Sequence, residues 1–249
     1  MSAAARGGRP PGAVHVISLD RTPERWSHFQ ADNPGIAMER FAAVDGRAAP
    51  LVALVEAGLA DAGLGYTPGA FGCALSHAAL WRRCVESGDA LTVCEDDAIL
   101  RPDFAAAAAA TAAQVDGAEL ILWGWNFDSV LAGRLFGETP FAMGFDQARM
   151  RGSIDRFRED RVQPTLLRLH RALGTVCYTV TPRGAQVLLA RCFPLRPESV
   201  FIPLLDRDLP NTGVDIAMNA AYPEMAAYVA FPPLALTRND ALASTVEGI

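Results

Sequence analysis

Residues 90–97 read Ala90-Leu-Thr-Val-Cys-Glu-Asp-Asp97, a short apolar run that passes directly into three carboxylates. A run of this length and composition is typical of a buried strand. Ligands of open parallel sheets bind at the carboxyl ends of the strands, which is where Glu95, Asp96 and Asp97 would lie. Three adjacent negative charges favour a divalent cation between them. The alternative is that Asp96 and Asp97 cap the following turn and face solvent.

Predicted strands and helices alternate on both sides of this run. Apolar segments predict strands at residues 14–19, 38–43, 119–123, 175–180 and 225–231. Capping residues and apolar spacing predict helices at residues 22–33, 51–62, 68–87, 103–114, 182–191 and 215–221. This alternation indicates an α/β protein, and we expect a single domain over residues 13–249 with a Rossmann-like, mostly parallel sheet flanked by helices.

Two segments lack this regularity. Residues 1–12 are rich in glycine and proline, and we expect them to be disordered. Residues 126–170 combine arginines, glycines and acids without a clear period. They predict an irregular insertion or a mobile region that covers a substrate.

The 249-residue chain has a formal net charge of −6, and all 22 of its basic residues other than histidine are arginines. Without lysine, the chain has no amine for Schiff-base chemistry and no phosphate-binding lysine of the P-loop or protein-kinase type. The acidic balance also argues against a nucleic-acid partner, because nucleic-acid-binding proteins carry basic surfaces.

The sequence predicts a cytoplasmic protein. It contains no apolar segment long enough to span a membrane, so at most peripheral membrane contact is expected. The N-terminal residues lack the apolar region of a signal peptide. The five cysteines are an odd number in mostly apolar surroundings, which is typical of reduced thiols.

Two other phosphate-binding families are disfavoured by the turn after the first strand, Leu19-Asp-Arg-Thr22. A haloacid-dehalogenase-type phosphatase needs a second aspartate where Thr22 stands. A dinucleotide-binding fold needs a glycine-rich G-x-G-x-x-G turn here, and this turn contains no glycine.

The helix predicted at residues 68–87 carries Cys73, His77 and Cys84 on one face. The usual paired spacings of a zinc site are absent, so a packed face is favoured over zinc ligation. Glycines at the start of this helix allow an anion to approach the backbone closely. Elsewhere, Trp123 and Trp125 predict either stacking on a sugar ring or burial in the sheet.

Several segments together resemble glycosyltransferase family 25, the group of bacterial lipooligosaccharide galactosyltransferases and collagen galactosyltransferases. The resemblance spans most of the chain, and Gly69-Ala-Phe-Gly-Cys-Ala-Leu-Ser-His-Ala-Ala-Leu-Trp81 followed by Glu95-Asp-Asp97 carries most of it. The other matching segments are Val16-Ile-Ser-Leu-Asp-Arg-Thr-Pro-Glu-Arg25, Ala43-Val-Asp-Gly46, Cys177-Tyr-Thr-Val-Thr-Pro-Arg-Gly-Ala185 and Val214-Asp215.

The resemblance implies a GT-A architecture and inverting transfer of a hexose, with galactose favoured, from a UDP-sugar. The acceptor would be a hydroxyl of a saccharide or glycolipid, as in lipopolysaccharide or capsule synthesis, and would contact residues 126–170. Asp97, with Asp96 and Glu95, would bind Mn²⁺ or Mg²⁺ and so stabilise the diphosphate leaving group. The residues implied to bind the nucleotide sugar are Leu19, Arg21, Arg25, Asp45, Gly72, Ser76, His77, Glu95 and Asp96.

Inverting transfer also needs a general base, and Asp215 is the candidate. Its other interpretation is a helix N-cap, and Asp206 and Asp208 are weaker candidates for the base. For Arg25, a surface helix position is as plausible as a phosphate or uracil contact.

The chain departs from the family pattern at two places. Ala70 stands where family members commonly have Glu, and Ser244-Thr245 stands where they often have Ser-Asp. The second departure leaves the third metal ligand open, with Asp240 or Asp215 as candidates. These departures leave open a non-catalytic saccharide-binding relative, and a nucleotidyltransferase on the same sheet and metal site is a further alternative.

Overall fold

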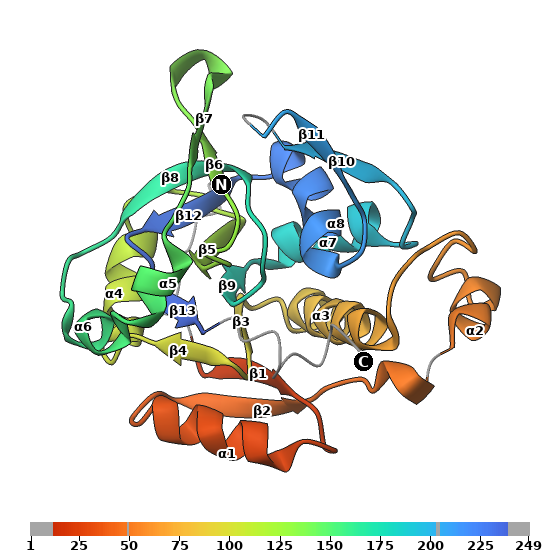
Figure 1. Cartoon of the computed structure of the whole chain (residues 1–249), viewed down its shortest axis with the longest axis horizontal. Helices are drawn as coiled ribbons and strands as arrows, with labels where there is room; N and C mark the ends of the chain where they lie inside the picture. The colour runs from red at the N-terminus through yellow and green to blue at the C-terminus, as the bar shows by residue number, and fades with distance from the viewer. Residues whose placement is uncertain (1–11, 49, 203–204, 239–249) are drawn as a thin grey trace, which may run out of the picture.

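The apolar run before the three carboxylates forms a central strand, β3 (Leu91–Glu95), of a nine-stranded sheet with the order β2-β1-β3-β9-β5-β12-β8-β6-β7 (Figure 1). The structure is a computed structural model that describes residues 12–48, 50–202 and 205–238. The other strands of this sheet are β1 (Val14–Ser18), β2 (Met38–Ala42), β5 (Leu120–Gly124), β6 (Leu131–Arg134), β7 (Pro140–Met143), β8 (Thr165–Arg171), β9 (Cys177–Val180) and β12 (Ala227–Phe231).

The predicted Rossmann-like α/β fold with a mostly parallel sheet is confirmed, although the sheet is mixed. The pairings of β1 with β2, β1 with β3 and β5 with β12 are parallel. Strand β9 lies antiparallel between β3 and β5, and β8 and β7 also oppose their neighbours. As a result, the N-terminal end of β9 lies at the same edge as the carboxyl ends of β1, β3 and β5.

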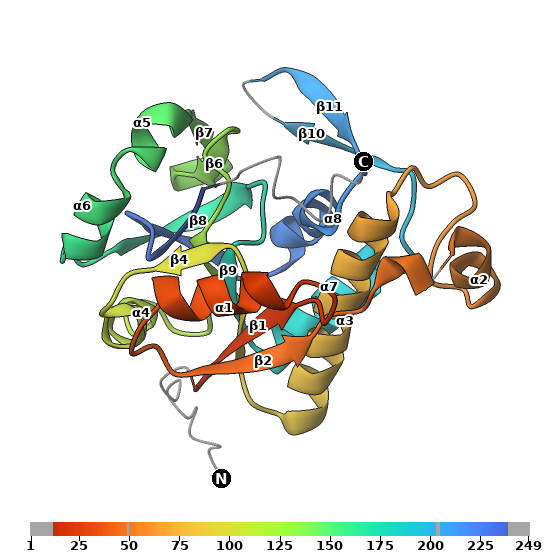
Figure 2. The same ribbon diagram turned by 60° about the horizontal axis from the view of Figure 1, so that its bottom comes forward.

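Helices cover both faces of the sheet (Figures 1 and 2). One face packs against the mutually contacting helices α3 (Pro68–Ser87), α7 (Pro182–Cys192) and α8 (Val214–Ala221). The other packs against α1 (Pro23–Asp32) and α4 (Phe104–Ala112). The remaining helical segments are α2 (Leu51–Glu56), α5 (Gln147–Arg151), α6 (Ile154–Glu159) and the 3-10 turns η1 (Gly46–Ala48), η2 (Phe136–Glu138) and η3 (Tyr222–Glu224).

Successive side chains of the central strands point alternately into the two cores, one on each face of the sheet. In β5, Leu120 and Leu122 belong to the core on the side of α3, whereas Ile121 and Trp123 belong to the core on the side of α1. Because successive side chains of a strand point to opposite faces, a strand buried on both faces reads as a continuous apolar run. This is the pattern from which the sequence predicted β1, β3 and β5.

Helix α3 begins and ends at the residues that the sequence predicted. The Thr67 hydroxyl accepts a hydrogen bond from the Ala70 backbone N–H, and Pro68 occupies the first helical position. Gly88 ends the helix with a φ of 72°, a conformation that glycine adopts without steric cost. The N-terminal end of this buried helix therefore has a fixed position relative to the sheet.

The prediction of irregular structure at residues 126–170 is wrong. This segment contains β6, β7, β8, α5 and α6, and its three strands extend the sheet. The strands escaped prediction because β6 and β7 are only four residues long and β8 is partly buried with two arginines, so no long apolar run or strict alternation marks them.

Smaller differences concern element length and number. The helix predicted over residues 51–62 ends at Glu56, because Gly58 adopts a φ of 68°. Four short strands were not predicted, and they form two antiparallel pairs outside the main sheet. These pairs are β4 (Ala98–Leu100) with β13 (Ala235–Thr237), and β10 (Ser199–Ile202) with β11 (Arg207–Pro210).

Some predictions lie outside the described residues, among them those for residues 1–11, Asp240 and Ser244-Thr245. Within the part of the chain that the structure describes, no helix combines the length and apolar character needed to cross a bilayer.

Candidate active site

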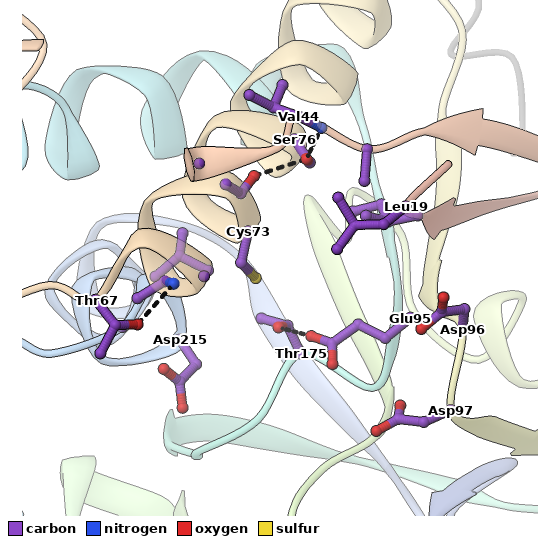
Figure 3. A pocket seen from close by; sticks show the side chains of 18 of the residues that line it. Leu19, Val44, Thr67, Cys73, Ser76, Glu95, Asp96, Asp97, Thr175 and Asp215 are labelled. Atoms are coloured by element: carbon purple, nitrogen blue, oxygen red, sulfur yellow. Dashed lines mark hydrogen bonds between the residues drawn. The ribbon is translucent and has the colours of Figure 1, made fainter. Parts of the chain in front are cut away.

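A cavity of about 480 Å³ opens at the carboxyl ends of β1 and β3, beside the N-terminal end of α3 (Figure 3). Nearly all the residues singled out from the sequence line it. Those lining residues are Leu19, Arg21, Arg25, Asp45, Gly72, Ser76, Glu95, Asp96, Asp97 and Asp215. Segments far apart in the chain thus converge on one site, as the sequence predicted.

Glu95 is the best-anchored carboxylate of the three. Its backbone N–H donates to the Val176 carbonyl at 3.1 Å, which aligns the end of β3 with the segment that enters β9. The Thr175 hydroxyl then donates a hydrogen bond to Glu95 Oε1, and His77 Nε2 lies 3.8 Å from the same oxygen. Burial raises the pKa of Glu95, but His77, Thr175 and the Arg25 charge outweigh it and hold the pKa below its usual value.

Asp96 is paired with Arg25. The Arg25 guanidinium donates to Asp96 Oδ1 from Nε at 2.8 Å and from Nη2 at 2.5 Å. Both side chains are largely buried, with 18% and 8% of their surfaces exposed. Arg25 is therefore a component of the cavity and not a surface position of α1, and its charge offsets part of the acidic cluster.

Asp97 differs from its two neighbours because its carboxylate opens onto the cavity. Desolvation in the cavity and the nearby charge of Glu95 raise the pKa of Asp97 to about 7, although Arg25 opposes this. An aspartate with such a pKa carries a charge that the surrounding residues compensate poorly. A bound cation would supply the missing compensation.

The charged residues that line the cavity are unbalanced. Among the described lining residues, two are arginines and five are acids. Both arginines already pair with acids, because Arg21 Nε lies 3.1 Å from Asp45 Oδ2 and Arg25 binds Asp96. The remaining carboxylates, Glu95, Asp97 and Asp215, leave the cavity acidic.

Asp215 begins α8 after Gly213 and faces the cavity. Its Oδ2 accepts a hydrogen bond from the Gly174 backbone N–H at 2.9 Å. Burial raises the pKa of Asp215, and the backbone hydrogen bonds from Gly174 and Ile216 partly offset this. In Figure 3, Asp215 lies on one side of the cavity, and Asp96 and Asp97 lie on the other. A carboxylate in this position can accept a proton from a ligand between the two sides.

A family model described as glycosyltransferase family 25 (LPS biosynthesis protein) matches residues 12–201, about three quarters of the chain. The chain belongs to glycosyltransferase family 25. It is therefore a glycosyltransferase by family, as the sequence motifs indicated. A search of the curated proteins found no match.

Two residues of the family 25 motif in α3, Gly72 and Ser76, line the cavity and hold its wall in place. The Ser76 hydroxyl accepts from the Val44 backbone N–H at 2.8 Å and donates to the Gly72 carbonyl at 2.7 Å. A Cβ on Gly72 would lie 2.4 Å from the Val44 carbonyl oxygen. The absence of a Cβ at Gly72 thus allows the 43–46 segment to pack closely against α3, which holds Asp45 at the cavity.

Replacing Gly46 by Ala is expected to disrupt this packing, because the new Cβ would lie 1.7 Å from the Pro68 carbonyl oxygen. We expect a loss of about 3 kcal/mol in the free energy of unfolding. For a chain of this length, this corresponds to a decrease of about 6–12 °C in Tm. Gly144→Ala is the matched control, since its Cβ would meet no atom within 4 Å. Equal Tm values for the two variants, measured by differential scanning calorimetry, would contradict this account.

His77 does not reach the cavity, contrary to the prediction that it contacts the nucleotide sugar. Its ring is fully buried beneath Glu95, and its Nδ1 lies 2.7 Å from the Tyr178 hydroxyl. Cys73 and His77 lie one turn apart on the same face of α3, so Cys73 lines the cavity while His77 lies one turn further from the helix N-terminus, against Tyr178 of β9. His77 is therefore a positioning residue for Glu95.

The two tryptophans are also buried and do not stack on a sugar. Trp123 and Trp125 are at most 1% exposed. The indole N–H of Trp123 donates to Thr179 Oγ1 at 2.8 Å, and Trp125 stacks on Phe127. Of the two interpretations left open by the sequence, burial in the sheet is confirmed.

Among the lining residues that sequence reasoning missed are Asn126, Gly174, Thr175 and Thr237. Thr175 lies at the cavity because β9 is antiparallel, which its sequence does not reveal. Gly174 has a φ of 85°, and a Cβ there would lie 2.3 Å from Asn126 Oδ1. Gly174, immediately before the predicted strand at residues 175–180, was the available signal for a tight turn.

Proposed function

We propose that this family 25 glycosyltransferase is a metal-dependent, inverting enzyme that transfers a hexose, with galactose favoured, from a UDP-sugar to a saccharide hydroxyl. The observation that supports this most is the acidic cavity. A nucleotide diphosphate would enter a cavity whose two arginines are already paired and whose carboxylates repel it. Binding of such an anion needs a cation.

The residues at the end of β3 fit a hard cation. Asp97 has a carboxylate open to the cavity and a pKa that reflects poorly compensated charge. Together with Glu95 and, through its remaining oxygen, Asp96, it offers the oxygen ligands that Mn²⁺ and Mg²⁺ prefer. When bound, the ion would neutralise the charge that develops on the diphosphate leaving group.

Other parts of the chain would bind and orient the two substrates. The N-terminal end of α3 opens on the cavity, where its helix dipole favours an anionic group. Arg21 lies at the cavity edge and can exchange Asp45 for a phosphate or uracil contact. Ala70 also lines the cavity, and its small side chain leaves space where family members commonly carry Glu.

Asp215 would act as the general base. In inverting transfer, the acceptor hydroxyl attacks the anomeric carbon from the side opposite to the leaving diphosphate and loses its proton. Asp215 lies across the cavity from the carboxylates proposed to bind the diphosphate, and its raised pKa favours accepting a proton. Asp206 and Asp208 are exposed and do not line the cavity, so neither takes this role.

The acceptor is proposed to contact the side of the cavity formed from residues 126–170, where Asn126 lies. A saccharide or glycolipid of surface glycan synthesis fits the family description. All five cysteines are free thiols, which fits a reducing compartment, so we place the reaction in the cytoplasm.

Mn²⁺ binding is expected to depend on pH because the cation must displace a proton from Asp97. Below its pKa of about 7 the Asp97 carboxyl is protonated, so affinity should decrease by about tenfold for each pH unit below 7 and level off above about pH 8. Titration calorimetry from pH 5.5 to 8.5 measures this dependence. Affinity that is constant over this range would contradict the assignment of Asp97 as a ligand.

A donor screen followed by product analysis tests the proposed reaction. We expect UDP-sugars with Mn²⁺ to raise the Tm of the protein more than other nucleotide sugars do. Incubation of the best donor with a panel of saccharide acceptors should then add one hexose, detected by mass spectrometry. Release of pyrophosphate from a nucleoside triphosphate would favour a nucleotidyltransferase instead. Normal UDP binding without transfer to any acceptor would favour a non-catalytic relative.

A further inference from the structure

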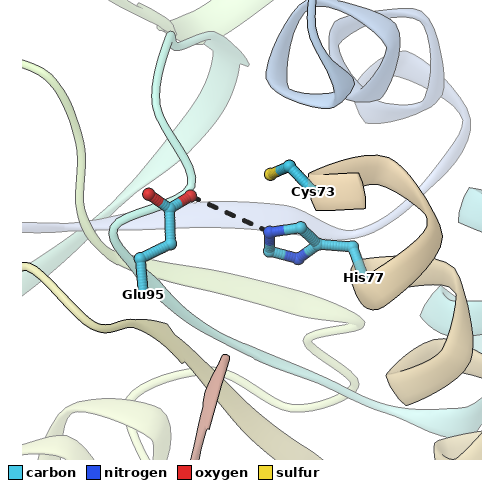
Figure 4. A group of neighbouring side chains, drawn as sticks. All are labelled: Cys73, His77 and Glu95. Atoms are coloured by element: carbon cyan, nitrogen blue, oxygen red, sulfur yellow. Dashed lines mark ion pairs between the residues drawn. The ribbon is translucent and has the colours of Figure 1, made fainter. Parts of the chain in front are cut away.

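The structure brings a third potential metal ligand to the Cys73–His77 pair of α3. The two residues are one helical turn apart, and their spacing alone did not indicate a metal site. Glu95, from the end of β3, lies against both of them (Figure 4). One ligand atom from each of the three residues lies within 4.8 Å of the other two.

The His77 ring is oriented for ligation by its neighbours. Its Nε2 is buried, has no hydrogen-bond partner and faces Glu95 Oε1 at 3.8 Å. Its Nδ1 lies 2.7 Å from the Tyr178 hydroxyl, which also accepts a hydrogen bond from the Trp81 indole N–H. The Tyr178 hydroxyl can accept from Nδ1–H, the contact that leaves Nε2 as the metal-binding atom.

The spacing of His77 Nε2 and Glu95 Oε1 is close to that of two ligands in a zinc site. Two ligands about 2.0–2.1 Å from a tetrahedral ion lie about 3.4 Å apart. The 3.8 Å between His77 Nε2 and Glu95 Oε1 needs only a small contraction to reach this value. Thr175, which donates to Glu95, supplies the kind of outer hydrogen bond that orients a carboxylate ligand.

Cys73 connects the proposed metal site to the cavity and influences which metal ion the site prefers. It is partly exposed and lines the cavity, so an ion in the cavity reaches its sulfur. Burial, together with the charge of Glu95, raises the pKa of the Cys73 thiol, so the metal-free side chain is neutral near pH 7. A coordinating ion displaces the thiol proton, which passes to solvent, and the thiolate becomes the ligand. Thiolate and imidazole ligands favour Zn²⁺ over Mg²⁺ or Mn²⁺.

We propose that Cys73 Sγ, His77 Nε2 and a Glu95 carboxylate oxygen bind one Zn²⁺ ion, with the fourth position open to the cavity for water or a substrate oxygen. Three protein ligands and one open position form the ligand arrangement of catalytic rather than structural zinc sites. This site adjoins the oxygen site around Asp97, and Glu95 belongs to both. The proposal does not depend on the proposed function.

Co²⁺ substitution tests the site, because thiolate-bound Co²⁺ gives a charge-transfer absorption that oxygen ligands do not. We expect one Co²⁺ per chain with this absorption, and its displacement by one equivalent of Zn²⁺. Cys73→Ser should abolish the absorption and weaken Zn²⁺ binding at least about tenfold by calorimetry. Cys192→Ser is the matched control, since Cys192 is buried in α7 and does not line the cavity.

Two further variants separate this site from the donor-metal site. His77→Gln should weaken Zn²⁺ binding as Cys73→Ser does, whereas Asp97→Asn should leave the cobalt absorption in place. Asp97→Asn should lose Mn²⁺-dependent UDP binding while it keeps the cobalt absorption, so failure of either proposal is recognised independently. The zinc site is refuted if the wild-type protein shows no thiolate absorption, or if Cys73→Ser retains both the absorption and the Zn²⁺ affinity.

Discussion

Asp97→Asn is expected to abolish the dependence of UDP binding on Mn²⁺ and, at the same time, to raise the thermal stability of the metal-free protein. The first effect follows because an amide cannot offer a cation the negative charge that the Asp97 carboxylate presents to the cavity. We expect UDP affinity in Mn²⁺ to decrease at least about 100-fold, consistent with the loss of a direct metal ligand.

The stability effect follows from the raised pKa. The folded protein holds a proton on Asp97 up to about pH 7, whereas the unfolded chain loses it near pH 4. Because the folded state binds more protons between these values, this group lowers the stability of the metal-free protein as the pH rises from 4 to 7. An asparagine does not ionise and so does not lower the stability in this way. At pH 8 we therefore expect the metal-free Asp97→Asn variant to have a Tm a few degrees higher than the wild type.

Calorimetric titration and thermal melting measure the two effects, and Asp116→Asn, at an exposed position outside the cavity, is the matched control. A lower Tm for Asp97→Asn would show that the carboxylate stabilises the fold. Unchanged Mn²⁺-dependent UDP binding would remove Asp97 from the metal site.

Asp215→Asn is expected to lower kcat by about 10²–10⁴-fold, the usual contribution of a general base. The amide oxygen can still accept the hydrogen bond from the Gly174 N–H, so the start of α8 should keep its position. UDP affinity in the presence of Mn²⁺ should therefore stay within about twofold of the wild type, because a loss confined to kcat indicates a group needed in the transition state.

Steady-state kinetics with the donor and acceptor identified by the product screen measure this effect. Asp208→Asn is the control, since Asp208 is exposed on β11 and does not line the cavity. If Asp215→Asn retains full kcat, the base lies elsewhere. If UDP binding is lost together with kcat, Asp215 acts on the donor or the metal instead.

The parts of the fold that the sequence predicted are those with strong local signals. The apolar runs of β1, β3 and β5 are buried on both faces, and α3 has a cap, a proline and a terminal glycine at the expected positions. These signals depend only on neighbouring residues. The strands within residues 126–170 are stabilised by pairing at the edge of the sheet, which leaves little trace in their sequence.

The residues of the candidate site also fall into those that the sequence predicted and those that depend on long-range contacts. The motif residues reached the cavity because the carboxyl ends of parallel strands meet at one edge, which follows from the predicted fold. The prediction for His77 was wrong, because the residue type and its motif do not reveal which face of α3 points into the sheet. Thr175 was missed because its contact with Glu95 depends on the direction of β9.

The ion pairs of Arg21 and Arg25 with acids of the cavity could also not be predicted from the sequence. The family resemblance implied that Arg21 and Arg25 contact the nucleotide sugar, with a surface helix position left open for Arg25. In the structure both guanidiniums contact acids of the cavity, so the arginines balance the cavity's own charge. The demand on a bound cation is therefore greater than the absence of lysine alone implied.

The dependence of UDP binding on a divalent cation is the most direct test of a metal-dependent UDP-sugar transferase. The measurement is calorimetric titration of UDP into the full-length wild-type protein at pH 8, once with Mn²⁺ and once with a chelator. We predict clear binding with Mn²⁺ and a decrease in affinity of at least about 100-fold with the chelator. Equal affinity in the two conditions, or no UDP binding in either, would contradict the proposed function.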